Sequence, residues 1–213
     1  SGGSFIGIKT ANRAPELYYA YIGIGQMTYQ IKSENLAFNY MLKEYKRQGD
    51  KKMVERLVNS PPGMLSPLSD AYLRLRDDAM HRIGIGTTRK MRSGISGIFI
   101  PSLLNREYTI IEKLNLWKGK AFSTKYLRDD MFSTDLTKEI TSLQIPAYFF
   151  HGIFDYTTSY EMAKEYYESI QAPVKGFYTF ERSAHSPIFE EPEKMLEILQ
   201  NDVMNGRNDF KDK

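Results

Sequence analysis

The sequence predicts an α/β protein in which helices cover a parallel sheet and a large helical insertion interrupts the chain. Two observations lead to this prediction. At both ends of the chain, short apolar runs typical of buried strands alternate with amphipathic segments of helical length, which indicates a parallel sheet. Between these two parts, roughly a hundred residues show helical spacing and no strand with a clean apolar–polar alternation.

The first part of the chain predicts a helix followed by a strand. Residues 3–14 place apolar side chains on a helical repeat. Pro15 ends this helix, because a proline disfavours helical backbone at the residue before it. Residues 20–25 (AYIGIG) form a β-branched and aromatic run bounded by glycine, which predicts a buried strand.

The insertion, residues 27–136, predicts a helical cap. Helical spacing occurs in four segments, residues 33–47, 50–59, 67–83 and 107–117. Suitable N-caps for the first three are Ser33, Asp50 and either Ser66 or Ser69. The glycine-rich, basic stretch 84–97 separates the third segment from the fourth.

The last part of the chain returns to alternating strands and helices. Strands are predicted at 145–150 and 175–181, and helices at 158–171 and 190–203. The predicted domain organisation is therefore a core part at residues 1–26, the helical cap at 27–136 and a second core part at 137–213.

Composition excludes several classes of function. The 213 residues are 41% hydrophobic and 26% charged, which is ordinary for a globular protein. The net charge of +3 is spread without a basic stripe, so we expect no nucleic-acid partner. The absence of cysteine excludes disulfides, cysteine nucleophiles and thiolate metal sites, and we expect no cofactor. No membrane-spanning run or signal peptide is present, so we expect a cytoplasmic protein without a membrane partner.

An aspartate and a histidine follow two neighbouring strands of the predicted sheet. Asp155 comes directly after the strand at 145–150, and His185 follows the strand at 175–181. Because parallel strands end at the same edge of a sheet, we expect the two side chains to meet there. An aspartate can orient an imidazole and stabilise its protonated form while the imidazole acts as a base for a serine.

Ser1 is the candidate nucleophile. Ser1-Gly2-Gly3 matches the second half of a G-x-S-x-G elbow, in which the residue after the serine donates a backbone N–H to the oxyanion. That role falls to Gly2, while Gly3 suits a turn where a β-carbon would collide with the neighbouring strand. Ser-Gly-Gly-Ser also matches a flexible spacer, so the terminus by itself leaves both interpretations open.

Three motifs together resemble the α/β-hydrolase family. Residues 1–16 resemble its nucleophile elbow and following helix, which ends in Pro-Glu fourteen residues after the serine. His151-Gly-Ile-Phe-Asp155 resembles its H-G-x-x-D acid loop, and residues 183–187 resemble its histidine loop. Within that family the chain is most similar to prolyl aminopeptidases (proline iminopeptidases), on residues 15–26, the cap and the sequence after Asp155.

The resemblance implies a serine hydrolase acting on a small peptide, amide or ester, with Ser1, Asp155 and His185 as its catalytic residues and Gly2 in the oxyanion hole. In peptidases of this group, acidic cap residues bind the free amine of the substrate. Candidates for that role, each also interpretable as a solvated helix charge, are Glu107, Glu112, Asp129 and Asp130.

The resemblance also implies that residues before Ser1 are missing. The family places a Gly-x dipeptide, a glycine-rich loop and five strands ahead of the serine, so residues 1–213 correspond to strands six to eight with the cap. An uncovered parallel edge is a pairing liability. We therefore expect this chain to be inactive alone and to need an N-terminal segment, or self-association, that covers the edge.

Two alternatives to the triad hydrolase remain open at this point. An N-terminal nucleophile hydrolase would use the α-amine of Ser1 as its base, and it would need neither Asp155 nor His185. A truncated, non-catalytic binding or oligomeric protein would retain the same motifs without using them.

Overall fold

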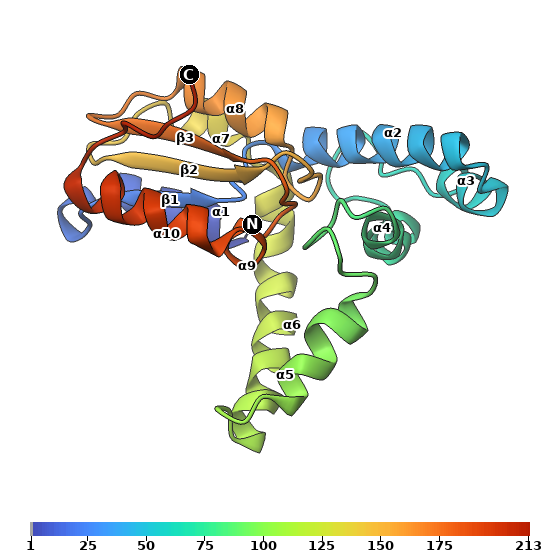
Figure 1. The fold of residues 1–213 in the computed structure, drawn as a ribbon. Helices are drawn as coiled ribbons and strands as arrows, with labels where there is room; N and C mark the ends of the chain where they lie inside the picture. The colour runs from blue at the N-terminus through green and yellow to red at the C-terminus, as the bar shows by residue number, and fades with distance from the viewer. Residues whose placement is uncertain (1) are drawn as a thin grey trace.

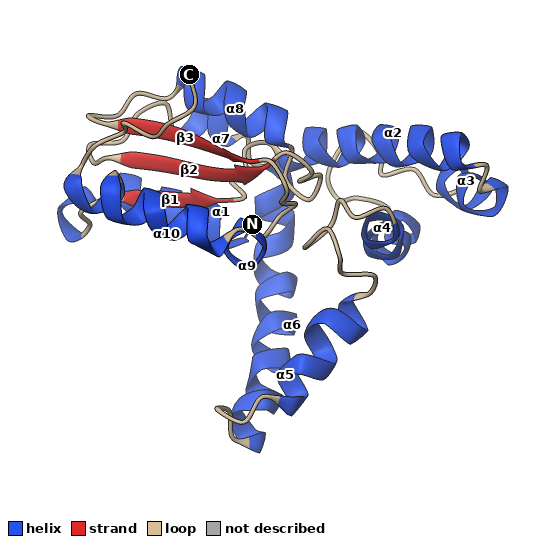
Figure 2. Cartoon of the chain, in the orientation of Figure 1, coloured by secondary structure: helices blue, strands red, loops and turns tan. Residues whose placement is uncertain are grey.

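The computed structural model describes residues 2–213, and these residues contain a three-stranded parallel sheet. The strands are β1 (Tyr21–Ile24), β2 (Ala147–Gly152) and β3 (Lys175–Phe180), in the order β1-β2-β3. Figure 2 shows the sheet with helices on both faces. The α/β fold class and all three predicted strands are confirmed.

One face of the sheet packs against α1 (Gly2–Arg13) and α8 (Tyr160–Ser169). Phe5 and Ile8 of α1 and Tyr166 of α8 are buried with Phe149 and Phe177 from the middle of the sheet. The apolar repeat that predicts α1 is the face that meets the sheet, and α1 ends before Pro15, as predicted.

The opposite face packs against α10 (Pro192–Asn201). Met195 and Ile198 of α10 are buried with Tyr148, Phe150 and Tyr178. Side chains alternate along β2, so both faces of this central strand are covered and all six of its residues are buried. Short helices flank these elements, namely η1 (Pro15–Leu17), α7 (Leu136–Glu139), α9 (Pro187–Glu190) and η3 (Val203–Asn205).

The chain between β1 and β2 is mainly helical, as the sequence predicts. It contains α2 (Gln30–Gln48), α3 (Lys51–Val58), α4 (Asp70–Arg82), a π-helical turn η2 (Ile95–Phe99), α5 (Ile100–Leu104) and α6 (Ile110–Ser133). Two predicted caps are confirmed: the Asp50 side chain accepts from the Met53 N–H and Ser69 accepts from the Tyr72 N–H. Helices α2, α3 and α4 share a second apolar core.

Helix α6 is much longer than the predicted segment 107–117. A capping box sets its start, in which Thr109 and Glu112 exchange hydrogen bonds. None of its 24 residues is buried. Figure 1 shows α5 and α6 projecting together from the rest of the molecule, and we call residues 95–133 the arm.

The two ends of the insertion lie together at its base. Tyr29 and Asp135 form an antiparallel bridge, and the Leu136 N–H donates to the Thr28 carbonyl at 3.0 Å. The boundaries at 26/27 and 136/137 stay a prediction. Within residues 2–213 no helix has the length and apolarity needed to cross a bilayer.

Candidate functional site

The loops after β2 and β3 bring Asp155 and His185 together. Asp155 lies in the turn that follows β2, and His185 lies in the loop between β3 and α9. The Nδ1–H of His185 donates to Asp155 Oδ2 at 2.8 Å. The sequence places these residues after adjacent strands, and the structure joins them by a direct hydrogen bond.

Asp155 is buried and fully engaged as an acceptor. Its Oδ1 accepts the backbone N–H groups of Thr157 and Thr158 at 2.8 and 3.0 Å. Its Oδ2 accepts the Thr158 hydroxyl at 2.9 Å and lies 3.0 Å from Nε2 of His151, in addition to the bond from His185. Burial alone would raise the pKa of Asp155, but the charge of His185 and the hydrogen bonds from both histidines outweigh burial and hold that pKa well below its ordinary value.

His185 is mostly enclosed, with 14% of its side chain exposed. Burial lowers the pKa of His185, and Asp155 opposes that effect only in part. Because Nδ1 carries the hydrogen donated to Asp155, Nε2 is the ring nitrogen suited to accept a proton from a nucleophile. The arrangement supports acid–base chemistry at neutral pH.

Two glycines permit the close approach of the histidine loop. Gly25 follows β1 with a φ of +57°, and a β-carbon there would lie 2.6 Å from His185 Cε1. Gly152 ends β2, and a β-carbon there would lie 2.3 Å from the Ser183 carbonyl oxygen. Side chains at these two positions would push His185 away from the sheet.

Two glutamates hold the histidine loop, and sequence reasoning missed both. Glu191 is buried, and its Oε2 accepts the Arg182 N–H at 2.9 Å and the Ser183 hydroxyl at 2.6 Å. Glu190 accepts the Ala184 N–H at 2.8 Å through Oε2. The Glu-Glu pair before Pro192 was the available signal, but a charged pair at a helix start is usually explained by the helix dipole alone.

Helix α2 holds the acid loop. Gln30 donates to the Thr157 carbonyl at 2.7 Å, and the Ser33 hydroxyl accepts the Ser159 N–H at 2.7 Å. The prediction that Ser33 caps α2 is wrong, because the helix starts one turn earlier with Tyr29 at its N-cap. The Ser33 side chain points instead to the loop that carries Asp155.

A buried ion pair lies beside the contact between α2 and the acid loop. Arg76 of α4 donates from Nε to Glu34 of α2 at 2.6 Å, and both side chains are largely shielded from solvent. The Tyr72 hydroxyl also donates to Glu34 Oε2, at 2.9 Å. Arg76 reaches the Thr157 carbonyl at 3.4 Å, so the ion pair connects two cap helices with the acid loop.

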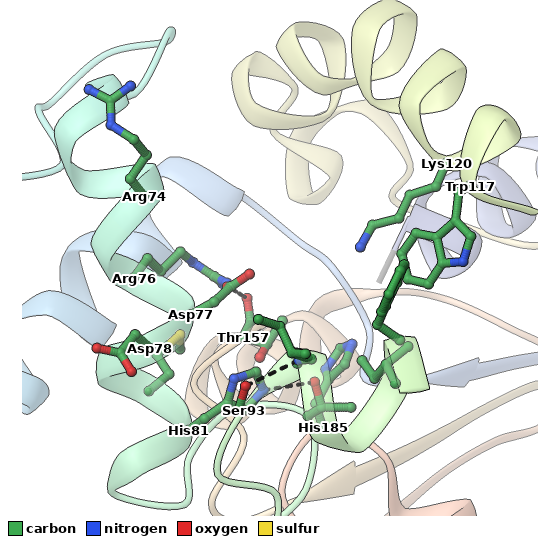
Figure 3. Close-up of a pocket in the computed structure, with 17 residues that line it drawn as sticks. Arg74, Arg76, Asp77, Asp78, His81, Ser93, Trp117, Lys120, Thr157 and His185 are labelled. Atoms are coloured by element: carbon green, nitrogen blue, oxygen red, sulfur yellow. Dashed lines mark hydrogen bonds and ion pairs between the residues drawn. The ribbon is translucent and has the colours of Figure 1, made fainter. Parts of the chain in front are cut away.

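A cavity of about 740 Å³ opens beside His185, between the cap and the sheet edge (Figure 3). Its apolar side chains come from Met80 of α4 and from the arm, which contributes Ile95, Ile98, Phe99 and Trp117. The charged or titratable side chains in its wall are Arg74, Arg76, Asp77, Asp78, His81, Lys120 and His185. The cavity can therefore hold a small apolar group next to a polar or charged one.

The acidic candidates suggested by the sequence are not in that wall. Glu107, Glu112, Asp129 and Asp130 are exposed on the arm, and none of them lines the cavity. The acids that line the cavity are Asp77 and Asp78 of α4 instead. Helical spacing in the sequence could not distinguish Asp77 and Asp78 from other exposed acids. The orientation of α4 over the sheet edge decides which acidic side chains line the cavity.

His81 also lines the cavity, and its environment differs from the expected one. A histidine at the end of a helix such as α4 often carries a charge that interacts with the helix dipole. The side chain is buried, burial lowers the pKa of His81, and its Nε2 lies 3.1 Å from the Thr87 hydroxyl. A neutral imidazole fits this environment better than a charged one.

The predicted nucleophile, Ser1, lies outside the described residues, so its position is not part of the observed geometry. Gly2, the predicted oxyanion donor, is the first residue of α1. The predicted collision at Gly3 is not found within residues 2–213, where a β-carbon at this position would meet no heavy atom within 4 Å. Gly7 is the glycine of α1 that faces β1, where a β-carbon would lie 3.3 Å from Tyr21 Cε2.

Within residues 2–213 no group of three or more histidine, aspartate or glutamate side chains is arranged to hold a metal ion. No protein-family model matches the chain. Similarity to individual proteins is clear, however. The chain is 27% identical over 201 residues to the Bacillus subtilis (strain 168) protein named "Probable aminopeptidase YbaC", over 93% of this chain and 62% of that protein. Over 72 residues it is 37% identical to the proline iminopeptidase of Heyndrickxia coagulans, over 34% of this chain and 24% of that protein.

Solved structures share the fold. The crystal structure of VinJ matches 96% of this chain and 64% of its own length with a TM-score of 0.56 and 15% identity. The proline iminopeptidase of Mycobacterium smegmatis matches 95% of this chain and 62% of its own length with a TM-score of 0.52 and 11% identity. The chain thus spans less than two thirds of the length of each of these proteins.

Proposed function

We propose, on the premise that this chain has the α/β-hydrolase fold and is similar to aminopeptidases and proline iminopeptidases, that it carries the catalytic residues of a serine hydrolase. Ser1 attacks a carbonyl carbon, and His185 takes the serine proton and returns it to the leaving group. Asp155 orients His185, and the backbone N–H of Gly2 stabilises the oxyanion. Water then hydrolyses the acyl-enzyme on Ser1.

The hydrogen bond between His185 Nδ1 and Asp155 Oδ2, at 2.8 Å, is the observation that carries this proposal. It fixes the tautomer in which Nε2 serves as the base. Because burial lowers the pKa of His185, the ring is neutral at pH 7 and can accept a proton. The five donors around Asp155 keep its carboxylate ionised and fixed in place.

The start of α1 supports Ser1 as the nucleophile. The Ser4 hydroxyl donates to the Gly25 carbonyl at 3.3 Å, and the Met27 N–H donates to Ser4 Oγ at 3.1 Å. Gly25 is the residue whose α-carbon faces His185. Gly25 therefore contacts both the first turn of α1, through Ser4, and the His185 ring.

The cavity favours a small acyl group with an apolar part. Phe99 and Trp117, whose ring centroids lie 4.9 Å apart, offer an apolar wall. Asp77 and the cations Arg74, Arg76 and Lys120 give the wall polar groups as well, whereas Asp78 is paired with Arg82 at 2.9 Å. Asp77 is held at 2.8 Å from Arg76, which in turn is anchored by Glu34. The proposed substrate is thus a short peptide, or a small amide or ester.

The outer edge of β1 is the place for a partner segment. Within residues 2–213, β1 pairs with β2 alone, so its other edge can accept a further parallel strand. The similar proteins are longer than this chain. We propose that a polypeptide resembling their N-terminal part covers this edge and supplies the second oxyanion donor, with self-association as the alternative.

A fluorophosphonate probe tests the function, because it reacts with an activated serine. The chain alone is expected to react slowly, and the chain co-expressed with the N-terminal part of a homologous aminopeptidase is expected to give one adduct, on Ser1. Ser1→Ala is the control and should abolish the adduct. A well-folded complex that gives no Ser1 adduct would reject the hydrolase proposal in favour of a non-catalytic protein.

Replacing His185 separates the triad mechanism from an N-terminal nucleophile mechanism. In the triad mechanism, His185→Ala should lower the labelling rate by at least about 10³-fold, because the serine loses its base. A serine activated by its own α-amine would keep its rate. Unchanged labelling of the His185→Ala complex would therefore contradict the roles proposed for Asp155 and His185.

A further inference from the structure

His151 is a second imidazole on the carboxylate that holds His185. His151 is the second-last residue of β2. Its Nε2 lies 3.0 Å from Asp155 Oδ2 and 3.0 Å from the Thr158 carbonyl oxygen. Both neighbours are acceptors, so Nε2 carries a hydrogen that it shares between them. The same Asp155 oxygen accepts from His185 Nδ1. Two imidazoles thus donate to one carboxylate oxygen.

The surroundings of His151 fix its orientation. The side chain is completely buried. Its ring lies nearly parallel to Phe177, at 9° and 6.3 Å between centroids, and the Tyr160 ring meets it edge-on at 5.9 Å. Its Nδ1 is buried without a hydrogen-bond partner in the described part of the chain. A hydrogen on Nδ1 would be a buried unsatisfied donor, so the surroundings favour the tautomer that donates to Asp155.

We propose that His151 is a positioning residue for the hydrolytic site, whose Nε2–H holds the Asp155 carboxylate in place and offsets part of its negative charge at His185. This inference rests on the proposed function, in which Asp155 orients the base. His151 does not contact the substrate, and it acts through Asp155.

The consequence for His185 has a definite sign. Asp155 favours the protonated form of His185, and a donor on the same oxygen weakens that influence. Removing the donor should therefore make His185 easier to protonate. The other charged or titratable side chains that line the cavity beside His185 are Arg74, Arg76, Asp77, Asp78, His81 and Lys120, and they stay unchanged in the comparison.

The test is an NMR titration of the His185 ring in the full chain, with and without the N-terminal partner segment. His151→Phe removes the donor and keeps an aromatic ring against Phe177. We expect its His185 midpoint to rise by about 0.5 to 1 pH unit, the scale of one lost hydrogen bond. His151→Gln keeps an N–H at the position of Nε2 and should restore a midpoint near that of the unsubstituted chain.

Tyr160→Phe is the packing control. It keeps the ring that meets His151 and removes only the hydrogen bond between the Tyr160 hydroxyl and Thr179. A role limited to packing predicts an unchanged His185 midpoint in all three variants, and that result in folded protein would overturn the proposal. A rise in His151→Phe alone supports it.

A measurement on the unsubstituted chain keeps the proposal testable if His151→Phe does not fold. Long-range ¹H–¹⁵N spectra report which nitrogen of each histidine carries hydrogen. We expect His151 to carry it on Nε2, and a hydrogen on Nδ1 alone would overturn the proposal. These readouts need no activity, so a well-folded complex that gives no Ser1 adduct would reject the hydrolase proposal without deciding the role of His151.

Discussion

The acid and histidine loops and the arm at residues 95–133 are built on opposite principles. Asp155 accepts from five donors in the loops and strand around it, and β2 beneath it is buried along its whole length. The arm has no buried residue in η2, α5 or α6, and its longest helix begins with a local capping box. Tertiary contacts therefore fix the loops, whereas local helix-forming interactions stabilise the arm. The side chains of Asp155 and His185 are thus held by the fold, whereas the arm that forms part of the cavity wall is exposed.

The largest difference between the two regions is expected in the effect of a substitution on the acylation rate. Asp155→Asn should lower the rate of Ser1 acylation in the complemented chain by about 10⁴-fold, because the amide cannot hold the required tautomer of His185. Asp129→Asn on the arm is the matched control, since Asp129 is exposed and lies outside the cavity wall. Probe-labelling kinetics measure both. A comparable loss in the arm variant would mean that the arm takes part in the chemistry.

A pair of phenylalanine truncations compares stability in the two regions. Phe149→Ala, in the middle of β2, should lower the free energy of unfolding by about 3–5 kcal/mol through lost burial and the cavity left behind. Phe122→Ala, on α6 with 65% of its side chain exposed, should change it by less than about 0.5 kcal/mol. Urea unfolding measures both. Equal losses would show that the arm is covered in solution.

Substitutions at two glycines with left-handed backbone distinguish the cost of backbone strain from the cost of a steric clash. Gly25→Ala should lower the free energy of unfolding by about 2–3 kcal/mol, because it adds a clash with His185 to the cost of a positive φ. Gly49→Ala, at the end of α2, has a φ of +74° and open space around its β-carbon, so only about 1 kcal/mol is expected. The His185 ring signals should shift in the first variant and not in the second.

The smallest expected effect is a dependence of stability on pH. Burial lowers the pKa of His185 and of His81 in the folded chain, so each contributes stability that is full above the unfolded histidine value of about 6.5. That stability is lost as pH falls through the lower folded value. Asp155 adds no slope between pH 5 and 8, because its pKa is already low. Urea unfolding from pH 7.5 to 5 should therefore show a decline, and His185→Gln should flatten it. A curve that His185→Gln does not change would contradict burial as the cause.

The order of strands and helices follows from the sequence because it depends on local periodicity. Apolar residues repeat along α1, and continuous apolar runs mark β1 and β2, so the fold class and the approximate limits of these elements are visible without coordinates. The pairing of Asp155 with His185 is also predictable, since adjacent parallel strands end at one edge. The length of α6 could not be predicted, because its apolar residues lie all around the helix and do not form an apolar face whose extent can be read from the sequence.

The residues that hold the acid and histidine loops could not be predicted from the sequence. Each contacts a loop that is distant in sequence or on another element, and its local sequence suggests a different, ordinary role. Ser33 looked like a helix cap and instead holds the acid loop. Glu191 is one of two adjacent glutamates before Pro192, a position typical of a helix start, and it holds the histidine loop. His151 looked like the end of a strand and contacts Asp155.

The sequence by itself thus determined the order of the main strands and helices and which two side chains, Asp155 and His185, they deliver to one sheet edge, because spacing along the chain encodes both. Only the tertiary structure decided which side chains surround those groups, since hydrogen-bond partners depend on how loops and helices far apart in sequence are packed together.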